Sequence, residues 1–274
     1  IRVKCLSSLL FHYKIRINMS VLVYTESEEG IFKKTAFEAV SYAKGLADML
    51  NTTVTAVSIN GNDVAELGKY GADKVLDISN EALQRFKAAT YAEAIAQAAK
   101  KEEAKVIILS STTNSKYLAP LLAVDLEAGY VPNVVALPTS TAPFNVKSNV
   151  FSNKAFAVTE KRTEVKLLAV ATNAYPISTT DNTAEVESFA VTLDDAKEVE
   201  VTDVEKVTDT ISIADAEVVV SGGRGLKGPE NWHLIEDLAE VLGAATACSK
   251  PVSDMGWRPH EEHVGQTGRP VASN

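Results

Sequence analysis

Two hydrophobic patterns alternate along the first half of the chain. Short apolar runs such as Val21–Thr25 have the length and residue types of buried strands. Between them lie segments such as Thr35–Leu50, in which apolar residues recur every three or four positions, as on one face of a helix. Strands are predicted over Val21–Thr25, Thr53–Ile59, Lys74–Ile78, Lys105–Ser111 and Val131–Leu137, and helices over Thr35–Leu50, Val64–Tyr70, Tyr91–Glu103 and Asn114–Glu127. This alternation predicts an α/β fold with a parallel sheet in a three-layer αβα domain.

The pattern changes after Pro143. Residues 145–150 and 155–159 read as two strands around a short polar turn, which predicts a β-hairpin. One more strand is expected over Val165–Ala171, and we expect it and the hairpin to form an antiparallel extension of the first domain. Residues 185–209 hold nine acidic residues and two lysines with little helical periodicity. We interpret them as a solvated strand and linker, with an acidic docking surface as the alternative.

These patterns divide the chain into four parts. Residues 1–18 are expected to be a tail outside the fold, residues 19–190 a first α/β domain, residues 191–210 a linker, and residues 211–274 a second α/β domain. The tail is basic and contains two serines and a short apolar run, features shared with transit peptides. Because the chain begins with Ile1 and a strand follows Met19 at once, we interpret Met19 as the natural start.

Composition and charge narrow the classes of function. The chain has 27 basic and 36 acidic residues, a net charge of −9, and an acidic surface argues against nucleic acid or an anionic membrane as a partner. No apolar run approaches the roughly 20 residues of a membrane-spanning helix. Cys5 and Cys248 make no disulfide framework, which fits a reducing compartment. We expect the bacterial cytoplasm, with the mitochondrial matrix as the alternative.

A glycine-rich turn follows the first strand expected in the second domain. The strand is predicted over Val218–Ser221, and the turn is Ser221-Gly-Gly-Arg-Gly225. Glycines let the backbone approach a ligand, Arg224 offers a planar fork of donors, and a helix beginning near Pro229 would direct free N–H groups at an anion. A tight structural turn explains the glycines about as well, because the dinucleotide fingerprint Gly-x-Gly-x-x-Gly is missing.

Two later polar turns are candidates for the same site. Ser249 and Lys250 come directly after a short predicted strand, Ala244–Cys248, so they are expected at the carboxyl edge beside the first turn. An ordinary surface lysine is the alternative. Val264-Gly-Gln-Thr-Gly268 places two hydrogen-bonding side chains between glycines, although a plain β-turn explains this motif alone better. The three turns together predict a cofactor site.

Other reactive residues give weaker signals. His260 and His263 flank two glutamates in a loop, but with no third ligand in view a solvated stretch is a better interpretation than a metal site. Cys248 is interpreted as a small buried side chain. The chain contains no phosphate loop of the Walker type, no Gly-x-Ser-x-Gly elbow and no meaningfully spaced carboxylate pair, so we predict no catalytic residues.

Taken together, these motifs closely resemble the α subunit of electron-transfer flavoprotein. The matching segments are Val218–Gly225, Asn231, Asp237–Ala239, Ser249, Lys250, Asp254 and Val264–Gly268 in the second domain and Val21–Tyr24, Gly71–Asp73 and Ser110–Thr112 in the first. The resemblance extends from Met19 to Asn274. It is most specific where Ser221–Lys227 combines with Val264–Gly268 at this separation.

The resemblance implies a heterodimeric electron carrier rather than an enzyme. In this family the second domain of the α subunit holds FAD, and the β subunit contacts the flavin from the other side. Electrons are implied to come from flavin dehydrogenases, typically of acyl-CoA β-oxidation, and to pass to a membrane quinone oxidoreductase. The chain itself is not expected to insert into a membrane.

By position, the resemblance also implies the residues that contact FAD. Lys250 stands where the family often has an arginine near the flavin ring. A lysine keeps the positive charge that favours negative charge on the flavin's carbonyl edge, but it lacks the planar fork, so the reduction potential is expected to differ. Thr267 is implied to lie near flavin N5. The implied contacts are Arg224, Ser249, Lys250, Val264, Gly265, Gln266 and Thr267.

The end of the chain departs from the family pattern. Family members continue with a Gly-Ile-Ser-Gly phosphate loop and a further strand that contacts the adenosine part of FAD, and neither occurs in these 274 residues. Pyrophosphate and adenosine contacts supply much of a dinucleotide's affinity. We therefore expect an incomplete FAD-binding domain that binds FAD weakly or not at all.

Three other functions compete with this interpretation. The first domain alone is compatible with an adenine-nucleotide-binding α/β module, although residues 20–60 contain no glycine-rich phosphate loop. An NAD-dependent deacylase would need a zinc-binding cysteine cluster, which two cysteines cannot make. An electron-bifurcating flavoprotein subunit is the third alternative, and a count of flavins per heterodimer would distinguish it from a simple carrier.

Overall fold

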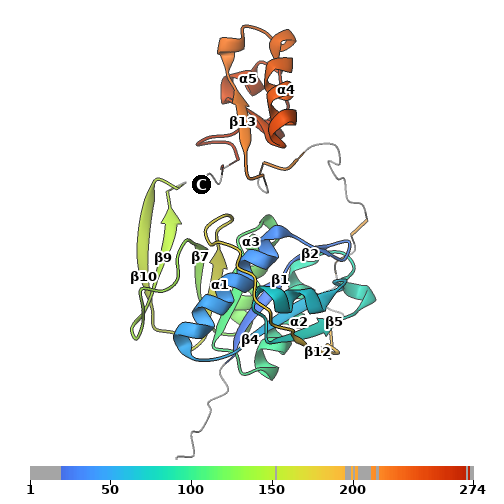
Figure 1. Cartoon of the computed structure of the whole chain (residues 1–274), viewed down its shortest axis with the longest axis vertical. Helices are drawn as coiled ribbons and strands as arrows, with labels where there is room; N and C mark the ends of the chain where they lie inside the picture. The colour runs from blue at the N-terminus through green and yellow to red at the C-terminus, as the bar shows by residue number, and fades with distance from the viewer. Residues whose placement is uncertain are drawn as a thin grey trace, which may run out of the picture.

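The computed structural model describes residues 20–151, 153–194, 199, 201–202, 211–213, 216–269 and 271. The predicted tail, the predicted start at Met19 and most of the predicted linker lie outside these residues. The described part forms a large α/β unit over residues 20–194 and a small one over residues 216–269 (Figure 1).

Strands (β), α-helices (α) and 3-10 helices (η) follow one another along the chain in both units. In the large unit they are β1 (Val21–Thr25), β2 (Ser27–Glu28), β3 (Ile31–Phe32), α1 (Lys34–Leu50), β4 (Val54–Ile59), η1 (Val64–Tyr70), β5 (Lys74–Ile78), η2 (Glu81–Leu83), α2 (Ala88–Lys101), β6 (Val106–Ser110), α3 (Thr113–Asp125), β7 (Gly129–Val134), β8 (Ser140–Thr141), β9 (Phe144–Val150), β10 (Ala155–Lys161), β11 (Lys166–Val170) and β12 (Glu185–Ser188). In the small unit they are β13 (Val219–Gly222), η4 (Arg224–Leu226), η5 (Pro229–Asn231), α4 (His233–Leu242), β14 (Ala245–Cys248), α5 (Lys250–Asp254) and η6 (His260–Glu262).

The large sheet is built outward from β1. Its strands pair in the order β10-β9-β7-β11-β6-β1-β4-β5-β12, with β8 against β9, and every pair from β7 to β12 is parallel. After β1 the chain adds β4 and β5 on one side, then returns to add β6 on the other. The strand order therefore reverses between β1 and β6.

Helices cover both faces of this sheet. Val21 and Val23 of β1 belong to the core beneath α1, whereas Leu22 and Tyr24 belong to the core beneath α2 and α3. This alternation follows from the period of two along a strand, and it buries β1 on both faces. The predicted three-layer αβα arrangement is confirmed.

The region after Pro143 is partly as predicted. The hairpin is confirmed as β9 and β10, which pair from Val150 opposite Ala155 to Phe144 opposite Lys161. The prediction that the following strand extends the antiparallel part was wrong, because β11 lies parallel between β6 and β7. Residues 167–170 are all buried, as expected of a strand whose two faces are both covered.

The acidic segment begins as part of the sheet. Glu185–Ser188 forms β12, a parallel edge strand beside β5. Beyond it, the Gln97 side chain exchanges hydrogen bonds of 2.6 and 3.1 Å with the backbone of Thr192, and Val191 and Leu193 pack on the core beneath α2. Residues 191–194 thus lie against the large unit, and the predicted domain limits stay a prediction.

Candidate functional site

Two parallel strands bring the first two polar turns together. In the register of β13 and β14, Gly222 lies opposite Cys248, so both strands end at the same edge. The backbone N–H of Ser249 donates to the Gly222 carbonyl oxygen at 3.0 Å. The glycine turn and the Ser249–Lys250 turn are therefore neighbours, as the carboxyl ends of parallel strands require.

The third turn lies against β14 as well. Cys248 and His263 form an isolated parallel bridge, and the Val264 N–H donates to the Cys248 carbonyl oxygen at 3.0 Å. The turn closes on itself, with the Gly268 N–H donating to the Gly265 carbonyl oxygen at 3.1 Å. All three polar turns thus meet at one edge of the small sheet.

The glycines of these turns have two different environments. A Cβ on Gly222 would lie 2.6 Å from the buried Trp232 ring, so this glycine is required by packing. A Cβ on Gly223 would meet only the Ser249 hydroxyl at 3.9 Å, and one on Gly225 or Gly265 would meet nothing within 4 Å. The backbone at these three glycines therefore faces open space, where a ligand can approach it closely.

The chemistry of the three turns suits an anionic ligand with a polar edge. Ser249 and Val264 are half-buried, whereas the other residues predicted to bind FAD are exposed. Arg224 and Lys250 supply two cations, and Ser249, Gln266 and Thr267 supply hydrogen-bonding groups at the same edge. This donor set fits the phosphates and the carbonyl edge of a flavin dinucleotide. The role of each residue stays a prediction.

The helix after the glycine turn begins later than expected. Residues 229–231 form the 3-10 helix η5, and α4 begins at His233 rather than near Pro229. The Asn231 side-chain amide donates to the Leu226 carbonyl oxygen at 2.8 Å, which fixes the loop between the turn and the helix. The glycine turn therefore continues into the short 3-10 helix η4, and α4 does not follow it directly.

Trp232 packs beneath the glycine turn, and this role was not predicted from the sequence. Its side chain is buried beneath Gly222, and the Arg258 guanidinium lies 5.6 Å from the centre of its ring. Arg258 in turn bonds Glu236 at 2.9 Å. The contact between Gly222 and a ring ten residues later could not be predicted from the sequence, because it depends on how the loop between them folds.

The remaining cysteine and histidine side chains near the turns have structural environments. Cys248 is fully buried, and burial raises the pKa of its thiol, which confirms its interpretation as a small buried side chain. His263 is buried, and His260 Nδ1 lies 2.9 Å from the Ser253 hydroxyl oxygen. Within the described residues, no group of three or more His, Cys, Asp or Glu side chains is arranged to hold a metal ion. No helix in the same residues is long and apolar enough to cross a membrane.

Known proteins match both units of the chain. Residues 21–194 match the family model described as electron transfer flavoprotein domain, and residues 212–274 match the electron transfer flavoprotein FAD-binding domain. The electron transfer flavoprotein subunit alpha of Syntrophomonas wolfei is 29% identical over 254 residues, which cover 92% of this chain and 80% of the relative.

Two further relatives show the same coverage. The electron transfer flavoprotein subunit alpha of Bacillus subtilis is 28% identical over 254 residues, covering 92% of this chain and 78% of its own length. Protein FixB of Clostridium saccharobutylicum is 26% identical over 259 residues, which cover 92% of this chain and 78% of the relative. The first family model alone spans more than half of the chain, so the chain belongs to the electron transfer flavoprotein family, among its α subunits.

Proposed function

We propose that this chain is the FAD-binding subunit of a heterodimeric electron carrier. The observation that carries the proposal is the meeting of three polar turns at the carboxyl edge of β13 and β14, with open glycine backbone and two cations. The match of residues 212–274 to a FAD-binding domain supports a flavin as the ligand. The chain is an electron-transfer protein and not a stand-alone enzyme.

The residues of the turns have distinct tasks in this proposal. When bound, FAD supplies the electron-transfer chemistry. Arg224 and Lys250 bind its negatively charged parts and keep positive charge at its carbonyl edge, while Ser249, Gln266 and Thr267 orient it by hydrogen bonds. The backbone at Gly265, whose φ of 121° favours glycine, admits the ligand without a side chain in the way.

The partners follow from the same proposal. An electron transfer flavoprotein β subunit would complete the heterodimer and contact the flavin from the other side. Flavin dehydrogenases, such as those of acyl-CoA β-oxidation, would donate electrons, and a quinone oxidoreductase would accept them. The bacterial sources of the relatives support the bacterial cytoplasm as the compartment.

Co-expression with a β subunit tests this proposal. Because the β subunit would contact the flavin from the other side, the complex is expected to bind FAD more tightly than the chain alone. With added FAD it is expected to be yellow and to contain one FAD per heterodimer, measured by flavin extraction. Trp232 and Trp257 are the two tryptophans of the chain, and both lie in the small unit. Flavin bound at the turns is therefore expected to quench their fluorescence.

Three outcomes separate the alternatives. Two flavins per heterodimer would favour the bifurcating type over the simple carrier. A colourless complex that takes up no added FAD would mean that the three turns are structural only. A yellow complex whose tryptophan fluorescence is unchanged when the flavin is removed would place the flavin away from these turns and contradict the proposed site.

A further inference from the structure

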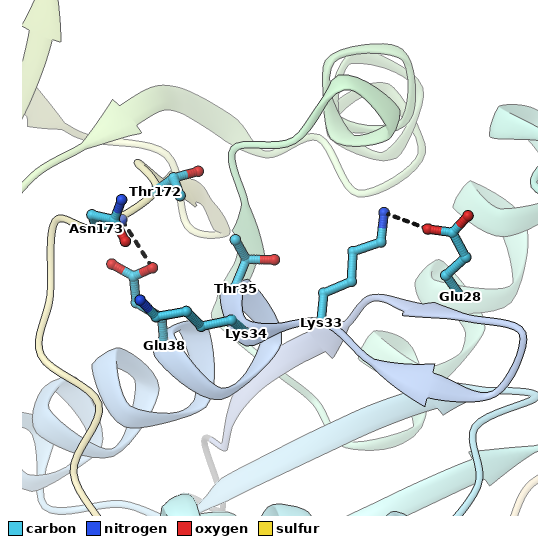
Figure 2. A pocket seen from close by; sticks show the side chains of 7 residues that line it. All are labelled: Glu28, Lys33, Lys34, Thr35, Glu38, Thr172 and Asn173. Carbon is cyan, nitrogen blue, oxygen red and sulfur yellow. Dashed lines mark hydrogen bonds and ion pairs between the residues drawn. The ribbon is translucent and has the colours of Figure 1, made fainter. Parts of the chain in front are cut away.

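A hollow of about 250 Å³ lies over the carboxyl edge of the large sheet. It lies apart from the three polar turns of the proposed flavin site, residues 221–225, 249–250 and 264–268 (the flavin turns). Its walls come from the segment after β1, including Lys34 and Thr35, and from Thr172 and Asn173 after β11 (Figure 2). The Ser110 hydroxyl at the end of β6 donates to the Thr35 carbonyl oxygen at 2.8 Å, which holds the start of α1 over this edge.

The topology of the sheet marks this place as a binding crevice. The strand order reverses between β1 and β6, with β4 on one side and β6 on the other. In open α/β sheets, ligands bind outside the carboxyl ends of the strands at such a reversal, because the connections leave the two strands in opposite directions and open a gap. The hollow lies beside that reversal, because its walls follow β1 and β11, the two strands that flank β6.

Thr35 brings an unpaired hydroxyl to the wall of the hollow. The residue is only 5% exposed, and its Oγ1 has no hydrogen-bond partner in the described part of the chain. A buried hydroxyl without a partner destabilises the fold. Because Thr35 lines the hollow, a small rotation of its side chain would let a bound group complete the hydrogen bonding of this oxygen.

The first turn of α1 adds backbone donors beside this hydroxyl. The helix has 17 residues, and the side chain of its N-cap residue, Lys33, makes no capping hydrogen bond. The first N–H groups of a helix have no acceptor within it, and the helix dipole makes this end positive. Lys34 and Thr35 are the first two helical residues, so their N–H groups and the Thr35 hydroxyl lie together.

The charged side chains around the hollow already have partners. Lys33 pairs with Glu26 at 3.3 Å. It also pairs with Glu28 at 3.2 Å, as Figure 2 shows. Lys34 pairs with Glu217 of the small unit. The two lysines therefore compensate two of these three carboxylate charges.

The remaining carboxylate, Glu38, is held by the opposite wall. It accepts backbone N–H groups of Asn173 at 3.0 Å and Tyr175 at 2.9 Å, and burial raises its pKa. Its oxygens are engaged and its negative charge is disfavoured there. The groups left to bind a ligand are donors.

We propose that this hollow binds the phosphate group of a small phosphorylated molecule at the N-terminus of α1. The N–H groups of Lys34 and Thr35 and the Thr35 hydroxyl bind the phosphate oxygens, and the Lys34 ammonium exchanges Glu217 for the anion. Free phosphate and the phosphate of a mononucleotide offer the same chemistry, and the hollow is larger than one phosphate ion. The site is independent of the flavin turns.

Titration of the full chain by NMR tests the proposal. Inorganic phosphate and a nucleoside 5′-monophosphate are added separately, and the backbone amide signals of Lys34 and Thr35 are expected to shift saturably with either. Tighter binding of the nucleotide identifies a nucleotide site, and equal binding identifies a phosphate site. Replacing Thr35→Val removes the hydroxyl at constant shape and is expected to weaken binding about tenfold.

Three variants control this experiment. Thr35→Ser keeps the hydroxyl and is expected to bind phosphate as the wild-type chain does, in contrast to Thr35→Val. Ser58→Ala removes another buried hydroxyl that lacks a partner in the described residues, but on β4 outside the hollow, so binding is expected to be unchanged. Glu217→Gln frees Lys34 and is expected to strengthen binding about twofold, because an exposed pair is weak.

Three results would overturn the proposal. One is an absence of shifts at Lys34 and Thr35 with both ligands at concentrations well above about 1 mM, the range of weak specific binding. Another is identical titration of the wild-type chain and the Thr35→Val variant. Shifts confined to residues near Arg224 would likewise contradict it, because they would place the anion in the flavin turns.

Discussion

The two α/β units of this chain bury their apolar side chains to different extents. In the large unit both faces of a broad sheet are covered, and its two cores hold fully buried side chains such as Leu46 and Ile108. In the small unit two clusters flank a two-stranded sheet, and α4 leaves Leu234 and Val241 55% and 83% exposed. The predicted flavin contacts all lie in the small unit.

This difference assigns most of the ligand-independent stability to the large unit and the proposed cofactor site to the small unit. Because its two cores are large, the large unit is expected to be stable without a ligand. The small unit buries less, so a ligand or partner that binds it is expected to supply a larger share of its stability. The effect of a variant on the stability of one unit can therefore be measured separately from its effect on the other unit.

The largest effect is expected from the core of the large unit. Ile108→Ala in β6 removes a fully buried side chain and is expected to destabilise this unit by about 2–5 kcal/mol. The measurement is urea unfolding followed by far-UV circular dichroism, to which the large unit contributes most. Val158→Ala, at a side chain that is 65% exposed, is the matched control with little expected change. A parallel loss in the tryptophan-monitored transition would show that the two units unfold together.

A smaller effect is expected where Gly222 packs on Trp232. Gly222→Ala places a Cβ 2.6 Å from the buried ring and is expected to destabilise the small unit by about 1–3 kcal/mol. Gly223→Ala makes the same change one residue later, where the nearest atom is 3.9 Å away, and is expected to leave the unfolding transition unchanged. Tryptophan fluorescence during urea unfolding measures both. Equal destabilisation by the two variants would contradict the assigned packing.

The same pair of glycines shows how far sequence reasoning reaches. The strand, the turn and the exposed Arg224 follow from local pattern, and the meeting of three turns follows from the parallel order of β13 and β14. The different environments of Gly222 and Gly223 do not, because they depend on a ring brought in by a later loop. Local signals thus predict a site, and packing decides which of its residues are structural.

The large unit teaches the same lesson at two other places. The strand over residues 166–170 was recognised, but its insertion between β6 and β7 depends on which neighbours it pairs with, and sequence distance does not fix that choice. The hollow beside Thr35 was missed because its two walls come from segments more than 130 residues apart. A threonine near a helix start is common, and only the folded sheet shows that its hydroxyl is buried without a partner among the described residues.

Removing a cation from the flavin turns is expected to leave the stability of the flavin-free chain unchanged. Neither the transition seen by circular dichroism nor that seen by tryptophan fluorescence is expected to shift. Arg224→Ala removes a charge-assisted donor from the proposed site and is expected to weaken FAD binding by the β-subunit complex about tenfold. Lys250→Met is expected to lower the flavin's reduction potential, because a positive charge near the carbonyl edge favours the reduced form. Lys154→Ala, an exposed lysine of the hairpin turn, is the charge-matched control. Unchanged FAD affinity in Arg224→Ala would remove this residue from the site.

The smallest effect concerns the edge strand β12 and depends on pH. Glu187 pairs with Lys101 and, at 2.7 Å, with Lys74, which ties β12 to α2 and β5. Hydrogen bonds from Lys101 and then Lys74 lower the pKa of Glu187 from 4.5 to about 2. Because the folded pKa is the lower one, the stabilisation is fully present above pH 4.5 and is lost as the pH falls towards 2.

Glu187→Gln is therefore expected to lower the Tm of the large unit at pH 7 and to leave it unchanged near pH 2. The side chain is 39% exposed, so the difference at pH 7 is expected to be at most about 3 °C and to shrink in high salt. Thermal unfolding followed by circular dichroism between pH 2 and pH 7 measures it. Glu185→Gln on the same strand, where the described residues show no ion pair, is the control. A Tm difference that persists at pH 2 would mean that Glu187 stabilises β12 by packing and not by charge.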